Sequence, residues 1–94
     1  MKKESFKLFF YDESQLFKKV LIQEDFSLMV GSNSNCDIIV SNKRISRSHC
    51  QIIYSKSDHL KLIDLNSTNG TFLNGIKLKP SIPYNLNLKD QVQL

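Results

Sequence analysis

Polar side chains that can form several hydrogen bonds at once are concentrated in residues 64–75. An apolar run ends at Leu65 and gives way to five small polar residues, Asn66 to Gly70. A turn between two strands needs only two or three residues that cap the backbone or tolerate positive φ. Because this loop carries more hydroxyl, amide and backbone N–H groups than a turn requires, we predict that it binds a ligand.

A second polar loop, residues 42–49, contains three cations and no acidic residue. The chain has a net charge of +4, and no acid lies between Asp37 and Asp58. The cations in that gap are Lys43, Arg44, Arg47 and Lys56. This placement predicts a local attraction for anions. Nucleic acid is not the expected partner, because no aromatic residue interleaves with the cations and no recognition helix is visible.

Residues of the same loop could be taken for a catalytic pair. Ser46 and Ser48 precede His49, yet no acid in this stretch would orient the imidazole ring. Asp37 and Asp64 each stand at a strand end beside a polar loop, where a carboxylate usually caps backbone N–H groups. We therefore expect no enzymatic activity.

Metal binding is also not expected. Cys36, Cys50, His49 and His59 lack the short paired spacing of metal ligands, so buried structural roles are favoured over a metal or cofactor site. No run is long enough to cross a membrane, and the first residues do not resemble a signal peptide. We expect a cytoplasmic protein with reduced cysteines.

The elements that must position these loops are short strands. Alternation of polar and apolar residues, with turn formers every eight to twelve positions, predicts ten strands and no amphipathic helix. They span residues 6–11, 16–22, 26–30, 36–40, 48–54, 59–65, 71–73, 76–78, 84–88 and 91–94, and the second could also be a short helix. Asn74-Gly75 is a strong hairpin signal. We predict one all-β domain, residues 1–94, that forms a sandwich of two twisted, mainly antiparallel sheets. Function should lie where loops 31–35, 42–49 and 66–70 gather at one end.

Four segments resemble the forkhead-associated (FHA) domain, a β-sandwich module that binds phosphothreonine in partner proteins. These are Gly31 with the Cys36-Asp37-Ile38 that closes its loop, residues 45–52 (ISRSHCQI), residues 64–75 (DLNSTNGTFLNG), and residues 88–92 (LKDQV). They occur in the family's order and at similar spacing over most of the chain. The resemblance implies an SMAD/FHA-like fold and a role in signalling or assembly.

The resemblance also implies a role for individual residues. Ser46 matches the serine that donates to the phosphate, and Arg47 the next residue, which contacts phosphate through its backbone and often a cationic side chain. Thr68 matches a residue that closes on the phosphothreonine, and Asn69 one whose amide pairs with the peptide backbone. The implied supports of the site are Gly31, His49 and Gly70.

One departure from the family pattern bears on phosphate binding. The family has arginine directly after the first loop glycine, and Ser32 occupies that position here. Losing a charged hydrogen-bond partner costs about 1.5–3 kcal/mol, or roughly ten- to a hundredfold in affinity. Lys43, Arg44 or Arg47 could supply the charge, and we expect that Arg47, together with Arg44, does so. The alternative is a phosphate-independent domain that binds a partner or itself through the sandwich surface.

A second departure lies at the end of the chain. Residues 88–92 resemble the approach to a glycine and one further strand, and the sequence ends at Leu94 without them. We therefore expect a domain from a longer protein that lacks its final strand, or a first strand, residues 6–11, with an unpaired edge. The expected state is a monomer or a weakly self-associating protein.

Overall fold

Ten short strands make up the regular structure of the described residues. The computed structural model describes residues 6–12, 15–22, 25–55, 57, 59–87 and 90–94. The strands are β1 (Phe6–Asp12), β2 (Gln15–Ile22), β3 (Phe26–Gly31), β4 (Ile38–Ile39), β5 (Cys50–Ser55), β6 (His59–Asp64), β7 (Phe72–Leu73), β8 (Ile76–Lys77), β9 (Tyr84–Asn85) and β10 (Val92–Gln93). No helix long and apolar enough to cross a membrane occurs in this part of the chain.

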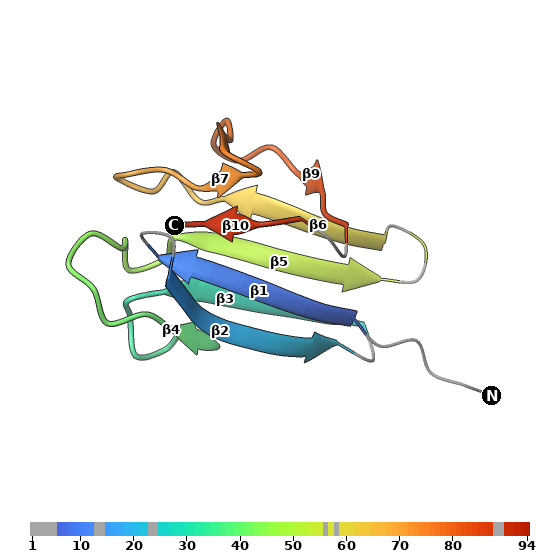
Figure 1. Cartoon of the computed structure of the whole chain (residues 1–94), viewed down its shortest axis with the longest axis horizontal. Coiled ribbons are helices and arrows are strands. Elements are labelled where there is room, and N and C mark those ends of the chain that lie inside the picture. Colours follow the sequence, from blue (N-terminus) through green and yellow to red (C-terminus); the bar gives the residue numbers. More distant parts are fainter. Residues whose placement is uncertain (1–5, 13–14, 23–24, 56, 58, 88–89) are drawn as a thin grey trace.

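The strands form two five-stranded sheets (Figure 1). One sheet has the order β2-β1-β10-β7-β8 and the other the order β4-β3-β5-β6-β9. Neighbouring strands are antiparallel except for the pairs β1–β10 and β3–β4, which are parallel. The predicted sandwich of two mainly antiparallel sheets is therefore confirmed.

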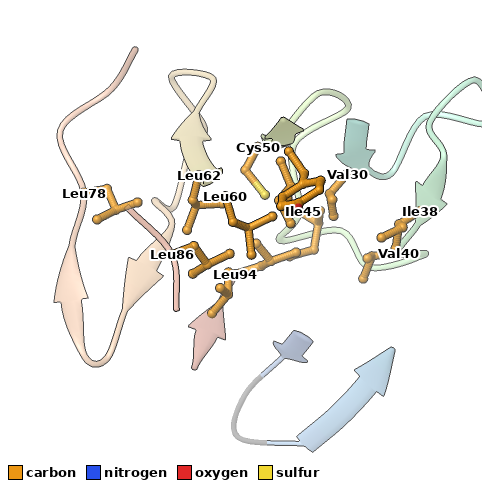
Figure 2. Packing of buried hydrophobic residues seen from close by; sticks show 13 residues of the cluster. Val30, Ile38, Val40, Ile45, Cys50, Leu60, Leu62, Leu78, Leu86 and Leu94 are labelled. Carbon is orange, nitrogen blue, oxygen red and sulfur yellow. The ribbon is translucent and has the colours of Figure 1, made fainter. Parts of the chain in front are cut away.

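The core lies between the sheets and follows from period-two alternation along β5 and β6. Ile52 and Leu62 face each other across the two strands and are fully buried. Burying a large aliphatic side chain contributes roughly 1.5–3 kcal/mol. Figure 2 shows the cluster that these strands share with the loops and the last strands: Val30, Ile38, Val40, Ile45, Cys50, Ile52, Tyr54, Leu60, Leu62, Leu78, Leu86, Val92 and Leu94.

A two-residue turn joins β7 and β8 as the Asn74-Gly75 signal predicts. Leu73 pairs with Ile76, and both turn residues have positive φ, 52° at Asn74 and 83° at Gly75. Two consecutive positive φ values are the requirement of a type I′ turn, which matches the twist of the flanking strands. The turn fixes the register of the hairpin and so decides which residues of β8 approach the loop before β7.

Two expectations about the first strands are resolved. The segment that could also have been a short helix is strand β2, paired with β1 along its length. The expectation of an unpaired edge at residues 6–11 is wrong, because β1 is flanked by β2 on one side and by β10 on the other. The closing segment supplies the missing neighbour: Phe10 pairs with Val92 and Tyr11 with Gln93.

Several predicted strands are shorter in the structure than the sequence pattern indicates. The strand predicted at residues 36–40 is reduced to β4, and the one at 84–88 to β9. The strand predicted from Ser48 begins instead at Cys50. Just before this strand, the His49 N–H donates to the Val30 carbonyl and the His49 carbonyl accepts from the Leu65 N–H. His49 therefore lies where the loop between β4 and β5 meets the sheet.

Candidate functional site

Three loops gather at the end of the sandwich where β5 begins and β6 ends (Figure 1). They are the loop between β3 and β4, the loop between β4 and β5, and the loop between β6 and β7. Each follows a strand of the core, so rigid elements hold both ends of every loop. The predicted gathering of the polar loops is observed.

The first loop fixes the backbone of Ser46 and Arg47. The Ser32 N–H donates to the Ser46 carbonyl (3.0 Å), and the Asn33 N–H donates to the Arg47 carbonyl (3.2 Å). The Cys36 thiol also donates to the Arg47 carbonyl at 3.1 Å. Bonds from a neighbouring loop thus set the position of the two residues predicted to meet phosphate.

Gly31 is required by the close approach of these two loops. A Cβ at this position would lie 2.0 Å from the Arg47 carbonyl oxygen and 3.0 Å from that of Ser46. Both contacts are with backbone, which cannot swing aside as a side chain can. Gly31 therefore supports the site through contact distance, and any larger residue would push the Ser46–Arg47 segment away.

Ser46 and Thr68 bring two hydroxyls together from loops far apart in sequence. The Thr68 N–H donates to Ser46 Oγ at 2.8 Å, and the Ser46 hydroxyl donates to Thr68 Oγ1 at 3.4 Å. Ser46 is half-buried and Thr68 is exposed. The Ser46–Thr68 hydroxyl bond is long for an O–H···O bond, so a charged acceptor oxygen would compete well for the Ser46 proton.

His49 ties the same two loops together from below. Its Nδ1 accepts from the Ser46 N–H (3.1 Å), so the ring carries its proton on Nε2, which donates to the Gly70 carbonyl (2.8 Å). The ring is fully buried. Both ring nitrogens bond backbone groups of the two loops, so His49 braces the loops against each other.

Asn69 adds a second link. Its Nδ2 donates to the Arg44 carbonyl at 2.7 Å, and the Asn69 side chain is exposed. A side-chain amide has two N–H groups and one oxygen. After this bond Asn69 can still donate once and accept, which is what an extended peptide backbone requires.

Asp64 organises the β6–β7 loop from inside. The carboxylate is buried and accepts from the Ser67 N–H (3.3 Å), the Ser67 hydroxyl (2.5 Å) and the Thr71 hydroxyl (2.7 Å). The interpretation of Asp64 as a loop cap is confirmed. Asp37 behaves differently, since it accepts from the Met29 N–H of the neighbouring strand β3.

The two cysteines are buried side chains. Both Cys36 and Cys50 are free and buried, as expected for reduced structural thiols. Burial raises the pKa of the Cys50 thiol far above its usual range, and the negative charge of Asp64 adds to the rise. Within the described ranges, no three His, Cys, Asp or Glu side chains group as metal ligands do.

The structure thus brings together all nine residues that the sequence predicted for the site, and one more that it did not. Lys77 of β8 lies against Gly70, since a Cβ on Gly70 would be 2.7 Å from Lys77 Cε. Sequence reasoning missed Lys77, although the two-residue turn at Asn74-Gly75 already fixes the register that places it there.

One end of this β-sandwich thus groups the hydroxyls of Ser46 and Thr68 and the amide of Asn69 with the loop that carries the exposed Arg44 and Arg47. The chain belongs to the FHA domain family: the family description "FHA domain" matches residues 28–94. This match confirms the family membership inferred from the sequence. FHA domains are protein-interaction modules.

Known proteins similar to this chain support the assignment. The human nuclear inhibitor of protein phosphatase 1 is 39% identical over 82 residues, which cover 83% of this chain and 23% of that protein. The chain therefore spans less than a quarter of that relative's length. The FHA domain of the CT664 protein from Chlamydia trachomatis has a TM-score of 0.78 at 26% identity, with 95% of this chain and 87% of that chain covered. The N-terminal FHA domain of S. cerevisiae Rad53p, solved with a phosphothreonine peptide, has a TM-score of 0.66 at 32% identity. The match covers 76% of this chain and 58% of that chain.

Proposed function

We propose that this domain is a non-enzymatic module that binds phosphothreonine in a partner protein, with the peptide extended across the loops after β3, β4 and β6. The observation that carries the proposal is the pair of hydroxyls from Ser46 and Thr68, fixed 3.4 Å apart at the loop end. Support also comes from the similar Rad53p domain, which was solved with a phosphothreonine peptide.

Phosphate recognition follows from the donors that face one another. A phosphothreonine carries a charge of about −1.5 to −2 and three strong acceptor oxygens. Ser46 donates its hydroxyl proton to one of these oxygens, and Thr68 donates from the opposite loop. Because the Thr68 N–H already fixes the Ser46 oxygen, little ordering remains to be done when the ligand binds.

The remaining contacts fix the peptide around the phosphate. Asn69 uses its second N–H and its oxygen on the peptide backbone, while its bond to Arg44 keeps the side chain in place. The Ser32 side chain is uncharged, so the positive charge that pairs with the phosphate comes from Arg47 and Arg44, which are both exposed. Charge-assisted hydrogen bonds of this kind are roughly twice as strong as neutral ones.

The experiment is a titration with a degenerate phosphothreonine peptide pool and its dephosphorylated counterpart. We expect binding that requires the phosphate and weakens as salt rises. In the variant Arg47→Ala, affinity should fall roughly ten- to a hundredfold, which is the cost of losing a charged partner. The matched control Lys61→Ala removes one charge from β6, where Lys61 donates to Asn85 of β9 and not to the loops.

Unchanged affinity in Arg47→Ala would show that Arg47 does not replace the missing arginine. Equal binding of both peptide pools, or none, would instead favour a second function, phosphate-independent association with a partner or another copy. That alternative is favoured by the nature of the residue at position 32, which is a serine. Its N–H is committed to the Ser46 carbonyl, and its side chain carries no charge for a phosphate.

A further inference from the structure

Lys77 is a cation that the fold delivers to the binding loops from a separate hairpin. Phe72 pairs with Lys77 across the β7–β8 turn, and Gly70 precedes Phe72 by two residues, so Gly70 and Lys77 are diagonal neighbours. A Cβ on Gly70 would lie 2.7 Å from Lys77 Cε and 3.4 Å from both Cγ and Cδ. The aliphatic stem of the lysine therefore lies over the bare backbone of Gly70.

This position joins Lys77 to the candidate site through residues already described. Gly70 follows Asn69, and its carbonyl accepts from His49, the ring that also holds Ser46. The Lys77 side chain is exposed. In the part of the chain that the structure describes, no ion pair or hydrogen bond engages its ammonium group. Lys77 thus presents an unneutralised charge next to the residue assigned to the peptide backbone.

We propose that Lys77 forms a second anion-binding position beside the phosphate position, and that the partner peptide carries an Asp or Glu side chain that reaches it. This inference rests on the proposed phosphothreonine binding. A carboxylate is the complementary group because the ammonium is a compact point charge on a flexible stem, without the fork that favours a second phosphate. Lys77 then determines which sequences around the phosphothreonine bind best.

The preference for an acidic peptide side chain is limited in size because Lys77 is exposed to solvent. A pair between a solvent-exposed lysine and a carboxylate is worth little, so the preference for an acidic side chain should be about two- to fivefold at low salt. Salt should reduce it further, because exposed charges are screened within about 10 Å at 0.1 M.

The test uses phosphothreonine peptides that differ at one position. Asp or Asn is placed in turn at each of four positions on either side of the phosphothreonine, and dissociation constants are measured by fluorescence anisotropy. We expect Asp to be preferred about two- to fivefold at one position or at two neighbouring ones. The preference should disappear in Lys77→Met, which keeps an unbranched stem over Gly70, and should persist in Lys77→Arg.

A matched control, Lys61→Met, removes the same charge from β6 and should leave the preference in place. If phosphopeptides bind but the Asp-to-Asn ratio at every position is the same in wild type and Lys77→Met, the second anion position is wrong and the proposed function stands. An equal loss in Lys61→Met would assign the preference to overall charge and also overturn it. Binding that ignores the phosphate altogether would remove both proposals.

Discussion

Single residues decide whether the loop cluster can hold a phosphate. Ser46, Thr68 and Asn69 supply the hydrogen-bonding groups, and backbone contacts fix all three. Ser32, for which the family resemblance implies an arginine, carries no charge. Substitutions at two neighbouring positions, Ser32 and Gly31, test separately the charge of the site and the packing of its loops.

Placing an arginine at position 32 should strengthen phosphopeptide binding. Ser32 is only half-buried, which leaves room for a longer side chain, and its backbone bond to Ser46 does not involve the side chain. For Ser32→Arg we expect affinity for phosphothreonine peptides to rise roughly tenfold, with binding of the dephosphorylated peptide unchanged. Isothermal titration calorimetry checks this. A matched Ser34→Arg, at an exposed position of the same loop, controls for added charge, and an equal gain there would contradict the prediction.

Replacing Gly31 should damage the site through packing. In Gly31→Ala the new Cβ meets the Arg47 carbonyl at 2.0 Å, so the loop must shift, and overpacking of this kind costs about 3 kcal/mol. The comparison is Gly75→Ala, where nothing lies within 4 Å and only the positive φ of 83° is penalised, by about 1 kcal/mol. Urea unfolding gives both values. Equal costs would mean that the loops do not approach as closely as described.

At the scale of elements, the β6–β7 loop is a preformed structure and not a flexible connection. Asp64 ends β6 and accepts three hydrogen bonds from the loop that follows it. Asn66 and Gly70 take positive φ at either end of the polar run. The loop is therefore shaped before any ligand arrives, and Asp64 is the group that shapes it.

Neutralising Asp64 should loosen this loop and lower stability. In Asp64→Asn one oxygen becomes an N–H donor facing hydroxyl and N–H donors, and hydrogen bonds to a charged group contribute about 1.5–3 kcal/mol. We expect the free energy of unfolding to fall by about that amount and phosphopeptide affinity to fall with it. Asp37→Asn, at an exposed carboxylate that accepts one backbone N–H, should change stability by less than about 0.5 kcal/mol. Similar losses in both variants would refute the role given to Asp64.

Much of this architecture follows from local patterns in the sequence. Alternation and turn residues locate the strands, and Asn74-Gly75 fixes the β7–β8 register, because both signals depend on neighbouring residues. Strand ends were harder to predict. By pattern the strand would start at Ser48, yet β5 starts at Cys50, although the His49 backbone still bonds Val30 and Leu65.

Contacts across the fold were the part that local patterns could not supply. The Cys36 thiol reaches the Arg47 carbonyl across eleven residues, and the Ser46 hydroxyl meets Thr68 across twenty-two. The family resemblance placed Ser46 and Thr68 at one site without giving these bonds. Lys77 carries no local sequence signal of a site, and only the hairpin pairing brings it beside Gly70.

For the molecule as a whole, the sandwich couples the core to the site through β5 and β6. Cys50 and Asp64 are paired residues of these strands, both buried directly beneath the loops. A change at this level of the core therefore bears on the whole fold.

Alkaline pH should destabilise the fold through Cys50. Burial, with the charge of Asp64 as a second cause, raises the pKa of this thiol in the folded state, whereas the unfolded thiol titrates near 8.5. The stabilising contribution is complete below pH 8.5. It is lost as pH rises, because only the unfolded chain then releases the proton. From pH 8 to 10 this one group should lower the free energy of unfolding by about 2 kcal/mol. Urea unfolding under reducing conditions, in wild type and in Cys50→Ala, isolates the effect: the variant starts less stable but should lose about 2 kcal/mol less over the same interval. Parallel pH profiles would show that Cys50 is ionised or solvated in the folded state, which would contradict its placement in the core.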